Sequence, residues 1–171
     1  MSLVRDHKAD IGIVASSIED STLRCIPLFE DHLSLVLPRN QVITDKGALH
    51  IQDLTGMPMI LFSKGTWYRS LTDELFDKYH LQPDVRMEID SFEAIIRLLH
   101  TCRAATLLPH SYMRHQLLED NELIVVPMRE LEETKRTTSL IHADSIAISP
   151  AIRMWINELA ARLNMHKDSS F

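Results

Sequence analysis

The sequence predicts an α/β fold, with a mostly parallel sheet that is covered by helices on both faces. Two observations support this prediction. Apolar strands and amphipathic helices alternate through the middle of the chain, from about residue 58 to residue 127. The strands are apolar throughout, as strands buried on both faces are, rather than alternating between apolar and polar residues. Apolar runs this short do not by themselves distinguish a strand from a buried helix.

Each predicted element follows from apolar runs and the residues that interrupt them. Strands are expected at 10–14, 24–29, 33–37, 58–62, 85–89, 104–108, 123–127 and 137–142. Helices are expected at about 66–80, 91–102 and 110–118, and from Ser149-Pro150 toward residue 165. In the first two helices apolar residues recur at steps of three and four, which gives one buried face. In the last helix Ser149 is the expected N-cap and Pro150 the first helical residue.

The order of these elements predicts two lobes. Residues 45–132 form one compact α/β lobe, and residues 1–40 and 137–171 together form the other. This nested layout requires two crossings of the chain between the lobes, near residues 38–44 and near residues 130–137. The length of 171 residues fits one domain or two small lobes.

Composition excludes several classes of protein. The chain has 18 Lys and Arg against 24 Asp and Glu, a net charge of −6, and therefore lacks the basic excess typical of a nucleic-acid surface. The charged residues Asp6 to Lys8 interrupt the start of the chain, which excludes a signal peptide. No apolar stretch approaches the roughly 20 residues of a membrane span. We therefore expect a cytoplasmic protein, in which Cys25 and Cys102 are reduced, buried thiols; one disulfide between them is the alternative.

Candidate binding residues follow the ends of three strands in the 45–132 lobe. In the order of the chain they are Ser63, Gly65 and Thr66, then Asp90, Ser91 and Phe92, then Pro109, His110 and Ser111. Ligands of parallel sheets bind beyond the carboxyl ends of strands, where helix N-termini favour anions. Arg69, one turn into the following helix, is a candidate clamp for a carboxylate.

The same residues also have plain structural interpretations. Ser and Thr at helix starts are ordinary caps, and Asp90 with Glu93 fits a capping box. Arg69 also fits an ordinary surface arginine. Only their placement at one edge of the sheet favours a binding site.

Nothing in the sequence indicates an enzyme, a metal site or a cofactor. The chain has only four glycines and no GxGxxG or P-loop motif. Its nine histidines include no HxxxH or HExxH pair, and no GxSxG motif marks a nucleophile. We expect no catalytic residue, no metal and no cofactor.

An ordered set of short motifs resembles the effector domain of LysR-type transcriptional regulators. ADIGIV is followed by LRCIPLFEDHLSLVLPRN, in which Pro27, Leu28, Asp31, Leu33, Leu35, Val36 and Pro38 match the family's hairpin. The similarity continues through QDLTGMPMILF, GTWYRSLTDELF, HLQPDVRMEID, TLLPHSYM and ISPAIRMWINEL. Each motif is weak, but together they cover nearly the whole chain in the right order. In two respects the chain departs from the family: the turn Thr101–Ala104 has no glycine, and the helix-turn-helix domain and the first strand and helix of the effector domain have no counterpart.

The resemblance implies two α/β lobes of the type 2 periplasmic-binding-protein kind, with a small effector bound between them. It places Ser16 and Ser17, Ser63 and Thr66, Ser91 and Phe92, and Pro109 along the effector site. The implied function is that of a ligand-sensing domain that binds a small, anionic effector. It also implies self-association as a dimer or tetramer, and contact with DNA only through the N-terminal domain. The alternative is a stand-alone solute-binding protein or an enzyme with the same two-lobe fold.

Overall fold

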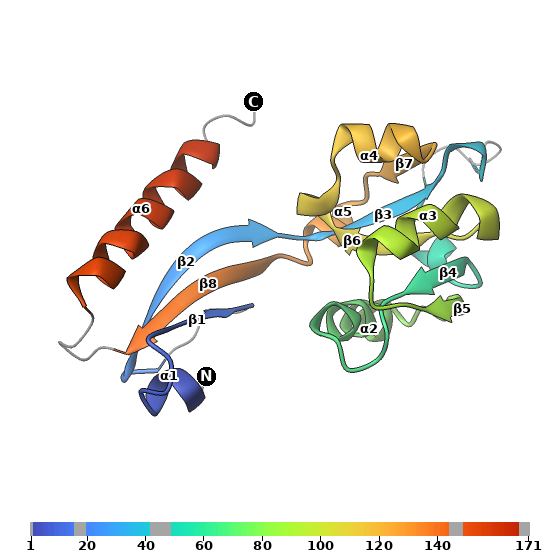
Figure 1. Ribbon diagram of the computed structural model, residues 1–171. Helices are drawn as coiled ribbons and strands as arrows, with labels where there is room; N and C mark the ends of the chain where they lie inside the picture. Colours follow the sequence, from blue (N-terminus) through green and yellow to red (C-terminus); the bar gives the residue numbers. More distant parts are fainter. Residues whose placement is uncertain (1, 16–19, 42–48, 144–148, 168–171) are drawn as a thin grey trace. The chain divides into compact units, whose positions relative to one another are not determined.

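The computed structural model describes residues 2–15, 20–41, 49–143 and 149–167. The chain divides into two compact units (Figure 1). Unit 1 comprises Met1–Glu30 and Arg136–Phe171, and unit 2 comprises Asp31–Lys135. The first division falls at Glu30, before the segment 33–38, which we had expected in the first lobe with residues 1–40. This segment forms strand β3 (Leu33–Pro38), whose strand partners all belong to unit 2.

The strands of unit 2 form a mixed arrangement, which corrects the predicted mostly parallel one. β3 lies between β6 (Thr106–Pro109) and β7 (Leu123–Val126) and runs antiparallel to both. β4 (Pro58–Leu61) pairs in parallel with β5 (Asp84–Glu88). A parallel bridge from Met59 to Ala105, just before β6, brings β4 beside β6.

The connections explain the two directions of pairing. Parallel neighbours need a long crossover, which α2 (Trp67–Tyr79) supplies between β4 and β5 and α3 (Phe92–Cys102) between β5 and β6. β3 has no such crossover before it, because only His32 separates it from β2 (Leu23–Asp31). The apolar residues of β3 indicate that the strand is buried, and all six of its residues are. They do not indicate whether the strand runs parallel or antiparallel to its neighbours.

Helices cover both faces of the unit 2 sheet, as the sequence predicts. On one face, α2 packs against β3 and β4 through Leu71, Leu75 and Phe76. On the other, α3 packs through Ile95, Ile96 and Leu99, together with α4 (His115–Asp120). The edge strand β5 differs from the predicted buried strands, since Val85 and Met87 are 38% and 39% exposed.

Several short elements have no counterpart in the prediction. The expected helix at 110–118 is instead a 3-10 turn, η3 (His110–Tyr112), followed after two residues by α4. The remaining short elements are α1 (Ser2–Arg5), η1 (Arg39–Gln41), η2 (Ile51–Leu54) and α5 (Arg129–Glu132). In the turn without glycine after α3, Arg103 itself adopts the left-handed φ of 47° that ends the helix.

Unit 1 is a three-stranded sheet in the order β1-β8-β2, with β1 at Ile11–Val14 and β8 at Arg136–Ala143. Ile141 of β8 packs with Val4 of α1, whereas its neighbour Leu140 packs on the opposite face with Ile156 of α6 (Pro150–Lys167). The predicted N-cap of this last helix is confirmed, because Ser149 Oγ accepts the N–H of Ile152 at 3.3 Å. Among the described helices, none combines the length and apolar character needed to cross a membrane.

Two fully buried threonines of unit 2 allow a matched test of hydrogen bonding. Thr106 Oγ1 in β6 has no hydrogen-bond partner among the described residues, whereas Thr72 Oγ1 in α2 donates to the carbonyl of Tyr68 at 3.0 Å. Replacement by the isosteric valine removes an unpaired hydroxyl in Thr106→Val and a paired one in Thr72→Val. We therefore expect Thr106→Val to be neutral or stabilising, and Thr72→Val to lower the free energy of unfolding by about 1 kcal/mol. Urea denaturation of both variants measures this difference, and equal losses would contradict the pairing.

Candidate functional site

The predicted strand ends lie at one edge of unit 2. Because β4, β5 and the segment entering β6 are parallel, their carboxyl ends point to the same edge. The antiparallel β3 begins there, and the backbone N–H of His110 donates to the carbonyl of His32 at 2.8 Å. We call this region the carboxyl edge; it comprises Asp31 and His32, Phe62–Thr66, Asp90–Phe92 and Pro109–Tyr112.

Two of the predicted binding residues cap helices. Thr66 Oγ1 accepts the N–H of Arg69 at 3.2 Å and donates to the carbonyl of Ser63 at 2.9 Å. Ser91 Oγ accepts the N–H of Ala94 at 3.3 Å and is the N-cap of α3, in the place we had expected for Asp90. Both hydroxyls are therefore used by the fold.

Ser63, in the loop before Thr66, differs from these two capping residues in how its hydroxyl is used. Its carbonyl accepts the Thr66 hydroxyl, but its own hydroxyl bonds to none of the described residues. Gly65 adopts a φ of 87°, a left-handed conformation that favours glycine and turns the chain from β4 into α2. Ser63 is therefore the predicted contact in this loop whose hydroxyl is not used by the described part of the fold.

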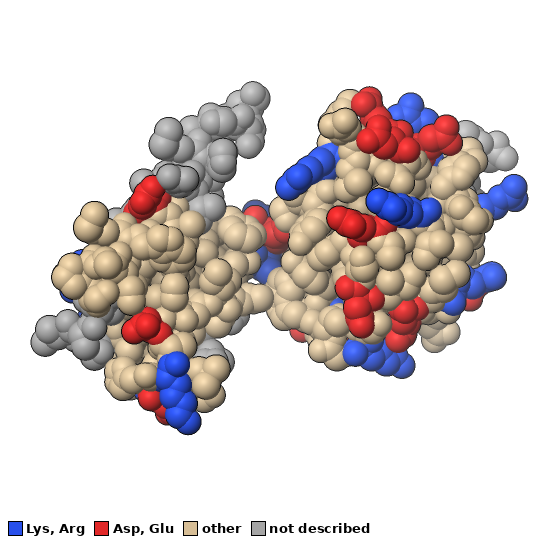
Figure 2. Space-filling model, viewed as in Figure 1, with Lys and Arg blue, Asp and Glu red and all other residues tan. Residues whose placement is uncertain are grey.

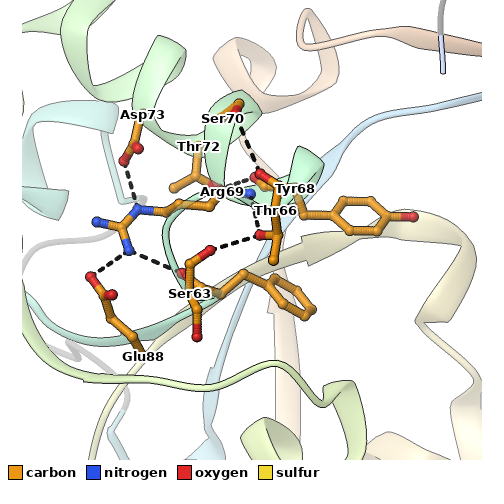
Figure 3. A network of polar contacts seen from close by, with 9 residues as sticks. Ser63, Thr66, Tyr68, Arg69, Ser70, Thr72, Asp73 and Glu88 are labelled. Carbon is orange, nitrogen blue, oxygen red and sulfur yellow. Dashed lines mark hydrogen bonds and ion pairs between the residues drawn. The ribbon is translucent and has the colours of Figure 1, made fainter.

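Arg69 is buried, with 7% of its side chain exposed, and it bonds only to the chain itself (Figure 3). Its Nη1 donates to the carbonyl of Phe62 at 2.9 Å and to Glu88 Oε1 at 2.6 Å, and its Nε donates to Asp73 Oδ1 at 2.7 Å. The guanidinium thus already holds two carboxylates and a carbonyl of unit 2, which favours a structural role for Arg69 over the predicted clamp for a ligand carboxylate.

The electrostatics of this network are consistent with a permanent ion pair. Burial by itself would lower the pKa of Arg69, but the hydrogen bonds and charges of Asp73 and Glu88 outweigh it and raise that pKa. The hydrogen bond from Arg69 also holds the pKa of Glu88 below its usual value, with a smaller contribution from the backbone N–H of Lys64. Both groups are therefore charged at neutral pH.

Four aromatic side chains, which we call the aromatic cluster, lie between the strand ends at the carboxyl edge: Phe62, Tyr68, Phe92 and Tyr112. Phe92 is central: its ring centroid lies 4.5 Å from that of Phe62, 5.3 Å from Tyr68 and 3.8 Å from Tyr112, on which it stacks. Burial raises the pKa of Tyr68, with further contributions from Tyr112 and Asp31, so its phenol is a neutral hydrogen-bond donor. The edge thus combines apolar ring surface with hydroxyl groups.

A second set of polar contacts lies just before and at the start of β3, between Asp31, His32 and Ser34 on one side and His110 and Ser111 on the other. Asp31 accepts the Ser111 hydroxyl at 2.6 Å, the Ser111 N–H at 3.1 Å and the His32 N–H at 2.9 Å. The rings of His32 and His110 stack with centroids 4.6 Å apart, and His110 Nδ1 lies 3.0 Å from Ser34 Oγ. These bonds join the β3 start to η3 across 80 residues of sequence.

The other predicted binding residues vary in position. Phe92 lies in the aromatic cluster, whereas Pro109 is buried at the end of β6, opposite Leu33, and exposes little surface. Ser16 and Ser17 lie outside the described residues. Four further side chains lie at this edge but were not among the predicted contacts: Asp31, His32, Tyr68 and Tyr112. The signal that was overlooked is that the tyrosines and Phe62 and Phe92 each lie at or within a few residues of a predicted strand end.

The described residues show neither a disulfide nor a clustered set of metal ligands. Cys25 and Cys102 are free thiols and half-buried. Within the described ranges, no group of three or more His, Cys, Asp and Glu side chains is placed to hold a metal ion. On the face of unit 2 drawn in Figure 2, Lys and Arg are interspersed with Asp and Glu rather than gathered into a basic patch.

Comparison with known proteins identifies the family of the chain. A family model described as the LysR substrate binding domain matches residues 1–164. The chain belongs to this family. The resemblance found in the sequence motifs is thereby confirmed.

Relatives in this LysR family include a curated regulator and solved regulatory domains. The HTH-type transcriptional regulator cbl of Klebsiella aerogenes is 30% identical over 95 residues, which cover 55% of this chain and 30% of the regulator. The CcmR regulatory domain of Synechocystis PCC6803, solved with 2-PG, superposes with a TM-score of 0.76 at 21% identity, covering 95% of this chain and 77% of that domain. The effector-binding domain of QuiR, solved with shikimate, has a TM-score of 0.73 at 21% identity and coverages of 96% and 77%.

These comparisons confirm the fold class. The solved LysR regulatory domains share the α/β fold of this chain. The chain spans 30% to about half of the length of the curated LysR regulators it matches.

His32 provides a test of the electrostatics at the edge of this LysR domain. Burial, and then the charge of His110, lower its pKa below 6.5, against the opposing charges of Asp31 and Glu132; Lys135 lowers it further. The unfolded chain therefore binds more protons than the folded one just below pH 6.5, so the free energy of unfolding falls as the pH decreases through that range.

In His32→Gln this part of the pH dependence is expected to vanish, because glutamine does not titrate. The measurement is the urea midpoint of each protein between about pH 7.5 and 5.5, where histidines titrate. Equal slopes in the wild type and His32→Gln would contradict the assignment.

Proposed function

We propose that this chain is the ligand-sensing domain of a LysR-type transcriptional regulator, and that a small anionic effector binds at the carboxyl edge of unit 2. One observation carries the proposal. The start of α2, the start of α3 and the Ser63 hydroxyl converge at this edge beside the aromatic cluster, in a chain that belongs to the LysR family. The first N–H groups of a helix have no partner within the helix and favour negative charge.

The proposed recognition uses backbone N–H groups and hydroxyls rather than an arginine. Arg69 is already bonded to Asp73 and Glu88, so the candidate contacts are Ser63 and the N–H groups at the starts of α2 and α3. Phe92 and Tyr112 provide apolar ring surface for the carbon skeleton of the effector. The complexes of CcmR with 2-PG and of QuiR with shikimate support an effector of this size and make both compounds reasonable probes. Ser16 and Ser17 remain proposed contacts, from the resemblance alone.

The proposed consequence of binding is regulatory rather than catalytic. An effector that binds one conformation of the domain better than another shifts the population toward it, and so repositions a linked DNA-binding domain. We propose that the regulator acts in the cytoplasm as a dimer or tetramer, and that its DNA contacts are made by a helix-turn-helix domain. Its curated relatives are HTH-type transcriptional regulators.

The first experiment is a thermal-shift screen of this domain against 2-PG, shikimate, other small carboxylates, amino acids and sugar phosphates. A ligand that binds only the folded state adds about 2.7 kcal/mol of stability at a hundredfold excess over its Kd. We expect anionic compounds among the hits. Hits confined to neutral or cationic compounds would overturn the proposed anion site.

Ser63→Ala tests the site with whichever compound gives the largest shift. The loss of one hydrogen bond, about 1 kcal/mol, should weaken binding roughly fivefold and leave the melting temperature of the free protein unchanged. Ser70→Ala is the matched control, because Ser70 is an exposed hydroxyl on α2 that bonds the Thr66 carbonyl. Thr66→Val is less informative, since it also removes a helix cap. Isothermal titration calorimetry gives the affinities, and equal Kd values for Ser63→Ala and Ser70→Ala would contradict a contact from Ser63.

A further inference from the structure

We propose that Arg69 and Glu88 form a positioning pair that holds the loop Phe62–Thr66 in the one conformation that presents Ser63 at the carboxyl edge. The role of this pair in effector binding rests on the proposed function. Its role in fixing the loop depends only on the contacts within unit 2.

The pair holds the loop at its start. β4 ends at Leu61, and the next carbonyl, that of Phe62, accepts a hydrogen bond from Arg69 Nη1 at 2.9 Å. The same nitrogen donates to Glu88 at 2.6 Å, so the cation that holds the loop is itself held by an anion on β5. The Phe62 carbonyl, which has left the strand pairing, is thus satisfied by a guanidinium whose charge a carboxylate balances.

The loop is held at its far end by the residue that carries the guanidinium. The backbone N–H of Arg69 donates to Thr66 Oγ1, and Thr66 in turn bonds the Ser63 carbonyl (Figure 3). The side chain and the backbone of Arg69 therefore restrain opposite ends of the same five-residue segment. Asp73, one turn later on α2, orients the guanidinium through Nε at 2.7 Å.

The chemistry of arginine explains why this position requires it. Burying a cation is costly unless all of its charge is matched, and here two carboxylates match it. A lysine would keep the charge but could not reach Phe62, Glu88 and Asp73 together from one ammonium group. A residue that only fastened α2 to β5 would need Glu88 but not the bond to the Phe62 carbonyl.

Hydrogen exchange followed by mass spectrometry tests the positioning role without a ligand. In Arg69→Met and in Glu88→Gln we expect the bonded amides of Thr66, Arg69 and Ser70 to exchange faster, by about tenfold and about threefold respectively, through local opening. Exchange in β6 and α3 should stay as in the wild type. Glu88→Gln alters a side chain that is 35% exposed, so it keeps the test available if Arg69→Met does not fold.

Arg86→Met is the matched control. Arg86 lies on β5, is exposed, and pairs with Asp84 rather than with the loop, so its loss should leave exchange at the amides of Thr66, Arg69 and Ser70 unchanged. Trp67 adds an optical readout, because it is 38% exposed and directly follows Thr66. In a Trp155→Phe background, acrylamide should quench Trp67 more strongly in Arg69→Met than in Arg86→Met.

The outcomes separate this inference from the proposed function. Unchanged exchange at the amides of Thr66, Arg69 and Ser70 in both Arg69→Met and Glu88→Gln, with only a lower global stability, would overturn the positioning role. Faster exchange confirms it, whether or not a compound binds. With 2-PG, shikimate or another hit as probe, the Kd should rise roughly tenfold in Arg69→Lys and not in Arg86→Met. Unchanged probe affinity in Arg69→Lys, despite a loosened loop, would overturn the link from the pair to effector binding.

Discussion

Parallel pairing of β4, β5 and the entry to β6 is the constraint on which the candidate site depends. Parallel strands must end at the same edge, so the residues that follow them converge even though they are separated by many residues in the sequence. The two crossover helices then begin at that edge and bring their unpaired N–H groups to it. β3 adds Asp31 and His32 because it is antiparallel and starts where the others end.

The end of a strand also leaves a buried backbone group without a partner in the sheet, and in unit 2 a charged side chain bonds to this group. Where β4 stops, the carbonyl of the buried Phe62 has left the strand pairing. The buried Arg69, whose charge is balanced by Glu88, donates to this carbonyl, while Thr66 and Ser91 accept N–H groups at the starts of α2 and α3. Much of the polar chemistry at the edge thus maintains the fold, which leaves Ser63 and the first N–H groups of two helices for recognition.

Features set by interactions between residues close in the sequence could be predicted, whereas features set by residues far apart in the sequence could not. The helices α2 and α3 begin and end within about one residue of their predicted bounds, because step-three and step-four periodicity is local. The direction of β3 was not predictable from its apolar run, since its partners β6 and β7 lie far away in the sequence. Arg69 was assigned to a ligand for the same reason: Glu88, its partner, is 19 residues away on a strand expected to be buried.

Asp31 connects the carboxyl edge to the path of the chain. It is the first residue of unit 2 after the chain leaves unit 1, and its carboxylate also holds Ser111 beside the aromatic cluster. Asp31 is also the last residue of β2, so the carboxylate that anchors η3 belongs to the strand by which the chain passes from one unit to the other. The residue at this boundary therefore cannot lose its carboxylate without the loss of the Ser111 contacts at the edge as well.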